Sequence, residues 1–337
     1  MNNLIKYENT YVLLPKNFTP LNEKSQDLLS YYFKTYYNII YLNIQDTKNF
    51  INKNNNKITK IIFYFWDDKN ADPKIYDFYL EIINFIQSKN DIKANIFIFT
   101  FDFWIRGPGC YKQLITKIYT PINYKVISFA YNIQHLRIFL TIENKCISNI
   151  IYNNFWAAYK VSYQPFNNNP ILKIFLSGVI NNSYQERQKI KNLNSAYIFE
   201  YKYNYQDIRN NNINYNNELN KYIACFNSSV YVKNIHNKLE NTHAVLLKTF
   251  EILVSGSLLI MPLIEEKYLN NIGLFHKKNC YLINTNNSEH IIHDINYILD
   301  NKNLNEINII RKQGQTDAIN IYNYDNKFIE LNNIIQS

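Results

Sequence analysis

Glycine and proline are scarce in this chain of 337 residues, with 6 and 8 copies, whereas tyrosine and phenylalanine number 30 and 21. Asparagine, isoleucine and lysine are also used heavily. This composition is typical of A/T-rich codons, and it gives the hypothesis of an A/T-rich microbial genome or a large DNA virus as the source. Because glycine is so rare, we expect each remaining glycine to meet a backbone requirement.

Closely spaced cysteines are also missing. The four cysteines are far apart and include no CxxC pair: Cys110, Cys146, Cys225 and Cys280. Their spacing argues against a zinc site and against a disulfide framework, and favours reduced thiols in a cytosol-like compartment. The first residues contain no apolar run of signal-peptide form, and the most apolar window, 246–264, is interrupted by charge. We therefore expect a soluble, cytoplasmic protein.

Blocks of clustered lysine and arginine are absent as well. The net charge of +9 and the pI near 9.0 suit nucleic acid, an anionic membrane surface or an anionic substrate. The lysines, however, are spread along the chain as on a solvated surface. We therefore expect no nucleic-acid partner, and weak contact with an anionic membrane surface remains an open alternative.

Short apolar runs alternate with helical stretches in the first part of the chain. Strands are expected at 11–14, 39–42, 61–66, 95–103 and 125–130, and helices at 24–37, 72–87 and 111–119. A length of 337 residues exceeds what one hydrophobic core usually serves. The alternation predicts a parallel sheet covered by helices on both faces.

The rhythm stops in an Asn-rich stretch at 148–170 and then resumes. Strands are expected at 172–176, 196–201, 223–227, 258–261 and 281–284, with helices at 184–193, 217–222 and 288–300 and a helical region at 304–335. We predict an α/β protein with two Rossmann-like domains, 1–150 and 171–337, joined by a linker at 151–170. The two domains are expected to face each other across a cleft, where ligands bind in open α/β folds, and the last helix is a candidate to cross back to the first domain.

The segment 242–262, THAVLLKTFEILVSGSLLIMP, is the most informative stretch. Lys248 and Glu251 are three residues apart and lie on one face of a predicted helix, which Gly256 ends as a C-cap ahead of a short buried strand. One interpretation is a surface ion pair worth about 0.3–0.5 kcal/mol. Since the neighbouring residues are apolar almost all round, we favour a ligand-binding face.

These side chains fit a phosphorylated sugar. Lys248 can neutralise a diphosphate, Glu251 can accept hydrogen bonds from both ribose hydroxyls, and His243 can donate to a phosphate or sugar oxygen. We count Gly256 with these donor-binding residues.

A second candidate anion site follows the strand at 172–176. Gly178 ends this strand ahead of a helix, so backbone N–H groups can face a phosphate, and Arg187 can add charge-assisted hydrogen bonds. A plain turn and a solvated arginine are the alternatives.

Residues 171–330 resemble the C-terminal half of glycosyltransferases of the GT-B fold, in particular the group 1 sugar-nucleotide enzymes. The resemblance rests on LKIFLSG at 172–178, YQER at 184–187, KTFEILVSGSLLIMP at 248–262, GLFHKKNCYLI at 273–283 and IIRKQG at 309–314. It implies transfer of a sugar from a nucleotide-diphosphate sugar to a hydroxyl of a glycan, lipid-linked or protein-linked acceptor. It also implies that Glu251 holds the ribose and that Lys248 lies near the diphosphate.

His243 departs from the pattern of many retaining members, which carry a glutamate there, whereas several inverting members have a histidine that touches the phosphates. Inverting transfer needs a base from the first domain, and the best candidate is Asp102, with Asp67, Asp68 and His135 as alternatives. No DxD motif is present, so we expect neither a metal nor any cofactor beyond the nucleotide-sugar co-substrate. A GT-B-like binding or structural protein without turnover is the alternative function.

Overall fold

The fold is described from a computed structural model of the chain. The structure describes residues 7–18, 33–66, 73–89, 91–101, 124–128, 150–152, 157–158, 162–177, 184–193, 196–201, 215–228 and 247–337. The chain divides into two compact units. Unit 1 comprises Met1–Asn154 together with Ile335–Ser337, and unit 2 comprises Phe155–Ile334.

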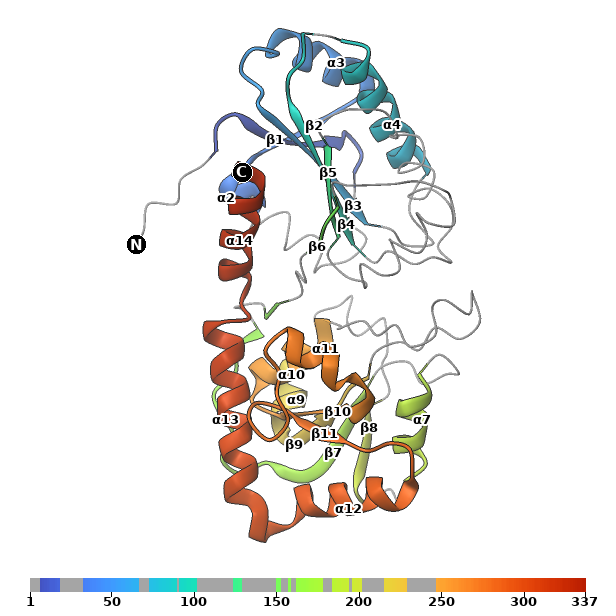
Figure 1. Cartoon of the computed structure of the whole chain (residues 1–337), viewed down its shortest axis with the longest axis vertical. Helices are drawn as coiled ribbons and strands as arrows, with labels where there is room; N and C mark the ends of the chain where they lie inside the picture. Colours follow the sequence, from blue (N-terminus) through green and yellow to red (C-terminus); the bar gives the residue numbers. More distant parts are fainter. Residues whose placement is uncertain are drawn as a thin grey trace. The chain divides into compact units, whose positions relative to one another are not determined.

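Unit 1 contains a sheet of parallel strands (Figure 1). The strands are β1 (Thr10–Pro15), β2 (Asn38–Leu42), β3 (Lys60–Trp66), β4 (Asn95–Phe101), β5 (Tyr124–Ser128) and β6 (Ile150–Tyr152), in the order β2-β1-β3-β4-β5-β6. Consecutive residues of β1 and β3, such as Ile61 and Ile62, are buried. Their continuous apolar runs follow from burial on both faces, as is usual for a parallel sheet.

Among the described residues of unit 1, the helices are α2 (Lys34–Tyr36), α3 (Ile44–Lys53) and α4 (Pro73–Gln87). Helix α3 begins at Asn43, whose side chain accepts a hydrogen bond from the Asp46 backbone N–H at 2.8 Å. In α3 only Thr47 and Ile51 are buried, so its apolar signal is weak and the sequence did not predict it. The helix expected at 111–119 lies outside the described residues.

Unit 2 contains a second parallel sheet (Figure 1). Its strands are β7 (Ile171–Ser177), β8 (Ile198–Tyr201), β9 (Tyr222–Phe226), β10 (Leu258–Pro262) and β11 (Tyr281–Ile283), in the order β11-β10-β9-β7-β8. The described helices are α7 (Gln185–Lys191), α9 (Tyr215–Lys221), α10 (Leu247–Ser255), η3 (Leu263–Glu265), α11 (Glu266–Asn271), α12 (Ser288–Leu299), η4 (Asn301–Asn303), α13 (Leu304–Asn320) and α14 (Tyr324–Gln336). The predicted helical region at 304–335 is thus two helices.

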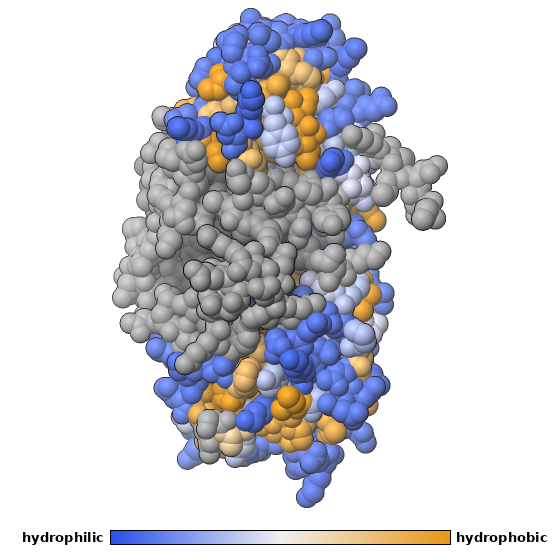
Figure 2. Space-filling model, turned by 180° about the vertical axis from the view of Figure 1, so that it is seen from behind, coloured by the Kyte–Doolittle hydropathy of each residue, from blue (hydrophilic) through white to orange (hydrophobic). Residues whose placement is uncertain are grey.

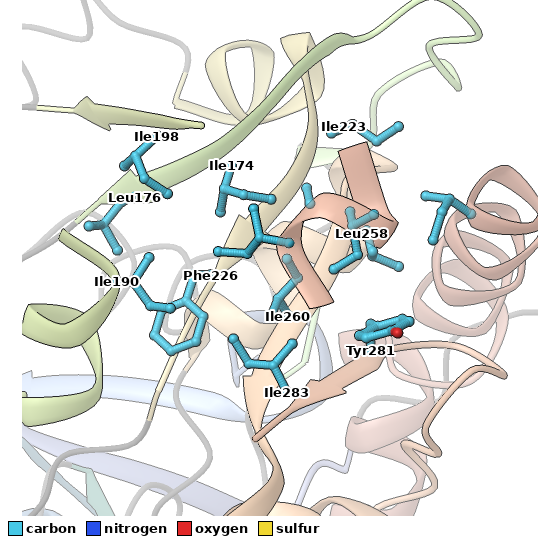
Figure 3. Close-up of a cluster of buried hydrophobic side chains, with 14 of the residues drawn as sticks. Ile174, Leu176, Ile190, Ile198, Ile223, Phe226, Leu258, Ile260, Tyr281 and Ile283 are labelled. Atoms are coloured by element: carbon cyan, nitrogen blue, oxygen red, sulfur yellow. The ribbon is translucent and has the colours of Figure 1, made fainter. Parts of the chain in front are cut away.

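Helices cover both faces of the unit 2 sheet. Figure 3 shows Ile174, Phe226 and Ile260 of three strands gathered with Ile190 of α7, and buried residues of α12 belong to the same cluster. Phe175 points to the opposite face, since side chains alternate along a strand, and there it packs near Tyr215 of α9 at 6.2 Å between ring centroids. Both faces are therefore buried.

The described part of the expected linker is fastened to unit 2 through α13. The Arg311 side chain donates from Nη2 to the Asn167 carbonyl at 3.1 Å and from Nε to the Gly256 carbonyl at 3.0 Å. Its guanidinium lies over the Phe166 ring at 4.7 Å. Burial lowers the pKa of Arg311 to about 10. The buried Arg311 of α13 thus links the segment that precedes β7 to the end of α10.

On the face shown in Figure 2, hydrophilic residues dominate the described surface and apolar residues form small groups. Among the described residues, no helix is both long and apolar enough to cross a membrane.

Candidate functional site

The carboxyl edge of the unit 2 sheet holds the polar side chains of interest. From β7 the chain crosses to β8 on one side, and β9 lies on the other side of β7. The point where successive connections leave in opposite directions is the usual ligand position in an open α/β sheet. In unit 2 this switch point lies between the ends of β7 and β9.

Arg187, in the first turn of α7, bridges this switch point. Its side chain is 2% exposed, and Nη2 donates to the Asn227 Oδ1 at 3.0 Å and to the Ser228 carbonyl at 3.1 Å. The guanidinium lies over the Tyr184 ring at 4.1 Å. Burial lowers the pKa of Arg187, and nearby groups that include Glu265 act in the opposite direction. The alternative of a solvated surface arginine is therefore wrong for this residue.

Lys248 is the second and Glu251 the fifth of the nine residues of α10, the next described helix after β9. Lys248 is half-buried and its ammonium lies 5.9 Å from the centre of the Tyr215 ring. Glu251 is only 6% exposed. A buried glutamate does not match the interpretation of a solvated ion pair.

Cys225, the fourth residue of β9, lies within electrostatic reach of these charged side chains. Burial raises the pKa of the Cys225 thiol to about 12; the charges of Lys248 and Arg187 oppose this increase, and that of Glu251 adds to it. All three charged groups therefore act on one buried atom at the end of β9. Geometry links the two helices that carry them: Arg187 of α7 and Thr249 of α10 both bond to the side chain of Asn227, and Thr249 lies one residue after Lys248 and two before Glu251.

Gly256 lies elsewhere, at the other end of α10. Its φ of +80° suits the left-handed position after a helix, and its N–H donates to the Leu253 carbonyl at 3.0 Å. The nine residues of α10 separate it from the start of that helix by about 13 Å. The structure thus shows the predicted C-cap role of Gly256, at the end of α10 opposite to Lys248.

The remaining predicted site residues lie outside the described residues: Gly178, His243 and Asp102, as well as the alternative bases Asp67, Asp68 and His135. Their roles stay predictions. No group of three or more His, Cys, Asp or Glu side chains suited to a metal occurs in the part of the chain that the structure describes.

Sequence reasoning missed several polar residues of this edge. Asn227 and Thr249 are fully buried, and Asn227 Nδ2 donates to Thr249 Oγ1 at 3.0 Å. Glu265 is 3% exposed and follows β10. The Ser228 hydroxyl is buried without a hydrogen-bond partner among the described residues. The available signal was position, because Asn227 and Ser228 directly follow the buried run YIACF.

Comparisons with known proteins give matches by structure alone. Neither the scan against protein-family models nor the search of curated proteins found a match. An alpha-glucosyltransferase in complex with UDP is similar, at 8% identity and a TM-score of 0.60, over 97% of this chain and 99% of that one. An alpha-glucosyltransferase in complex with UDP-glucose and DNA containing an abasic site has 9% identity, a TM-score of 0.59 and coverage of 97% and 98%. A glycosyltransferase from Rickettsia africae has 10% identity, a TM-score of 0.55 and coverage of 98% of both chains.

The expectation of no nucleic-acid partner is contradicted. Two of the similar structures, both alpha-glucosyltransferases, are complexes with DNA. The expectation rested on the absence of a contiguous block of lysine and arginine. That criterion was too narrow, because phosphate contacts come from residues that are distant in sequence and respond to the summed charge of the surface.

The predicted fold class is confirmed. The two parallel sheets with their covering helices correspond over nearly the whole chain to those of the similar enzymes. At 8–10% identity this likeness concerns the fold. The chain therefore has the two-Rossmann-domain GT-B fold of these glycosyltransferases.

Proposed function

We propose that this protein is a glycosyltransferase that moves a sugar from a nucleotide-diphosphate sugar to a hydroxyl acceptor. The observation that carries the proposal is the buried hydrogen-bond chain from Arg187 through Asn227 to Thr249 of α10, at the carboxyl edge and switch point of the unit 2 sheet. The full-length fold likeness to enzymes whose structures hold UDP or UDP-glucose supports the same ligand class.

Each group has a proposed role in donor binding. Lys248 neutralises the diphosphate, and Glu251 accepts hydrogen bonds from the ribose hydroxyls. The field of Arg187 adds to the positive potential near the phosphates. We place Gly178 and His243 at the phosphate side as predicted from the sequence, and leave Gly256 as the residue that ends α10.

The transfer step exchanges one bond at the anomeric carbon of the sugar. The bond to the diphosphate oxygen breaks, the bond to the acceptor oxygen forms, and the acceptor proton passes to a base, for which Asp102 is the candidate if configuration is inverted. The leaving diphosphate gains negative charge, so cationic side chains lower the barrier by stabilising that charge. We also propose a cytosolic location, since Cys225 and Cys280 are free and buried thiols.

Donor binding is tested by calorimetric titration of UDP, UDP-glucose, GDP and dTDP into the wild-type protein. Replacing Glu251 by Gln should weaken the preferred nucleotide by about 1.5–3 kcal/mol, or roughly 10- to 150-fold, because a hydrogen bond to a charged group is lost. Glu330→Gln on α14, an exposed carboxylate paired with Lys327, is the matched control and should leave the affinity unchanged. Absence of binding by any nucleotide would refute the proposal.

DNA is a candidate acceptor or partner in addition to glycan, lipid-linked and protein-linked acceptors. The DNA complexes of the similar enzymes and the net charge of +9 favour it. Incorporation of labelled sugar should be measured with duplex DNA, oligosaccharide, lipid and peptide acceptors in parallel. Nucleotide binding without transfer to any of these would favour the alternative of a binding protein without turnover.

A further inference from the structure

Asn227 joins two helices at the carboxyl edge of the unit 2 sheet. Its side chain lies directly after β9 and is fully buried. Oδ1 accepts from Nη2 of Arg187 at 3.0 Å, and Nδ2 donates to Oγ1 of Thr249 at 3.0 Å. Arg187 belongs to α7 and Thr249 to α10, so a continuous chain of hydrogen bonds connects the two helices through one amide.

The chemistry of the partners fixes the orientation of this amide. A guanidinium only donates hydrogen bonds, so the amide oxygen must face Arg187 and the amide nitrogen must face Thr249. Arg187 is held in turn by the Ser228 carbonyl and the Tyr184 ring. Because all these groups are buried, each bond lost leaves a polar atom without solvent to replace the partner.

Thr249 occupies a position that controls the first turn of α10. It is the third residue of the helix and is fully buried, with Lys248 one residue before it and Glu251 two residues after it. A helix turn has 3.6 residues, so fixing Thr249 fixes the rotation of both charged side chains about the helix axis. The side chains of Asn227 and Arg187 are occupied by these buried hydrogen bonds, whereas Lys248 is half-buried.

We propose that Asn227 is a positioning residue for donor binding, which links Arg187 to Thr249 and so holds Lys248 and Glu251 in the orientation that receives a nucleotide diphosphate. This inference rests on the proposed function, and it assigns to the pair Asn227 and Thr249 a role in affinity in addition to stability. Preorganised ligand groups bind more tightly because their ordering is complete before the ligand arrives.

The test compares variants of Thr249 in calorimetric titrations with UDP and UDP-glucose. Thr249→Val keeps the shape but removes the hydroxyl, and we expect affinity to fall by about 10-fold, the effect of losing one buried hydrogen bond. Thr249→Ser retains the hydroxyl and should restore affinity to within about 2-fold of wild type. Asn227→Ala should weaken binding at least as much as Thr249→Val.

Ser255→Ala is the control for general damage to α10. Ser255 is also fully buried in that helix, but its hydroxyl donates to the Ile252 carbonyl at the far end. This variant should lower the melting temperature and leave nucleotide affinity unchanged. If Asn227→Ala fails to fold, the Val and Ser variants of Thr249 still decide the question.

The outcomes separate the two proposals. If the wild type and Thr249→Val bind the nucleotide with equal affinity, the positioning role alone is overturned. Equal losses in Thr249→Val, Thr249→Ser and Ser255→Ala would also overturn it, since the effect would follow stability instead of the hydroxyl. No nucleotide binding by the wild type would overturn the proposed function and this inference with it.

Discussion

Among single residues, Ser228 carries a buried hydroxyl that has no hydrogen-bond partner in the described part of the chain. Such a group costs about 1–3 kcal/mol. Ser228→Ala should therefore raise the free energy of unfolding by about 1 kcal/mol in urea denaturation. Ser257→Ala is the matched control, because the Ser257 hydroxyl donates to the Leu219 and Tyr222 carbonyls, and it should lower stability by a similar amount. A change in the free energy of unfolding that has the same sign in both variants would contradict this account.

His276 makes the folded protein sensitive to acid. Its Nδ1 accepts a hydrogen bond from the Leu282 backbone N–H at 2.9 Å, and burial together with Lys277 lowers its pKa below the usual 6.5. The unfolded chain therefore binds a proton more readily, so stability is present above about pH 6.5 and is lost as the pH falls through that value.

Amide hydrogen exchange can follow this loss at the bond itself. Protection of the Leu282 amide, corrected for its intrinsic rate, should decrease between about pH 7 and 5. The pH dependence of stability should be shallower in His276→Gln. Unchanged Leu282 protection across this range would disprove the role of His276.

The helix that carries the charged candidates could be predicted because spacing in the sequence identifies one helix face. Lys248 and Glu251 are three apart in an apolar segment, and both lie on α10 as predicted, with Glu251 buried and Lys248 half-buried. The pairing of Asn227 with Thr249 could not be predicted, since a hydrogen bond between residues 22 apart leaves no periodic signal. Gly256 was assigned to ligand binding although its backbone conformation already accounts for it.

Helix α13 shows how element packing overrides intrinsic helix preference. Gly314 lies inside this helix, and a Cβ added there would meet the Asn279 carbonyl oxygen at 2.6 Å and a Leu253 methyl carbon at 2.9 Å. On an isolated helix, alanine is better than glycine by about 1 kcal/mol. Here the close backbone contact opposes that gain.

Gly314→Ala should therefore lower the melting temperature. We expect a loss of about 1–3 kcal/mol, the usual cost of overpacking. Asn305→Ala, at an exposed position of the same helix, is the control and should be neutral or slightly stabilising. A more stable Gly314→Ala variant would show that α13 can shift away from the loop at Asn279.

At the scale of each element, apolar runs predicted the strands more reliably than the helices. Strands β1 to β5 and β7 to β11 lie at the predicted positions, and the continuous apolar runs of strands such as β1, β3, β9 and β10 follow from their burial on both faces. Helix α3 and the short strand β6 were missed, since α3 is mostly polar and β6 has only three residues. Neither gives a pattern long enough to recognise.

For the molecule as a whole, the net charge of +9 predicts that any affinity for nucleic acid depends on salt concentration. If DNA is a partner, its affinity should fall steeply between about 50 and 200 mM salt, because bound phosphates release counterions. Fluorescence anisotropy with a labelled duplex measures this slope, and UDP affinity under the same conditions provides the comparison. An affinity for DNA that is independent of salt would exclude contact through its phosphates.

Arg311 also constrains the order in which unit 2 can form during synthesis. Its partners Asn167 and Gly256 precede it by 144 and 55 residues. Closing loops of this length costs conformational entropy, which grows with the logarithm of loop length. The strands β7 to β10 leave the ribosome well before Arg311. The hydrogen bond that fixes Asn167, in the segment before β7, can therefore form only after α13 has been synthesised. Until then Ile307 and Ile310 of α13 are missing from the buried apolar cluster of unit 2, so part of that cluster is exposed in the nascent chain.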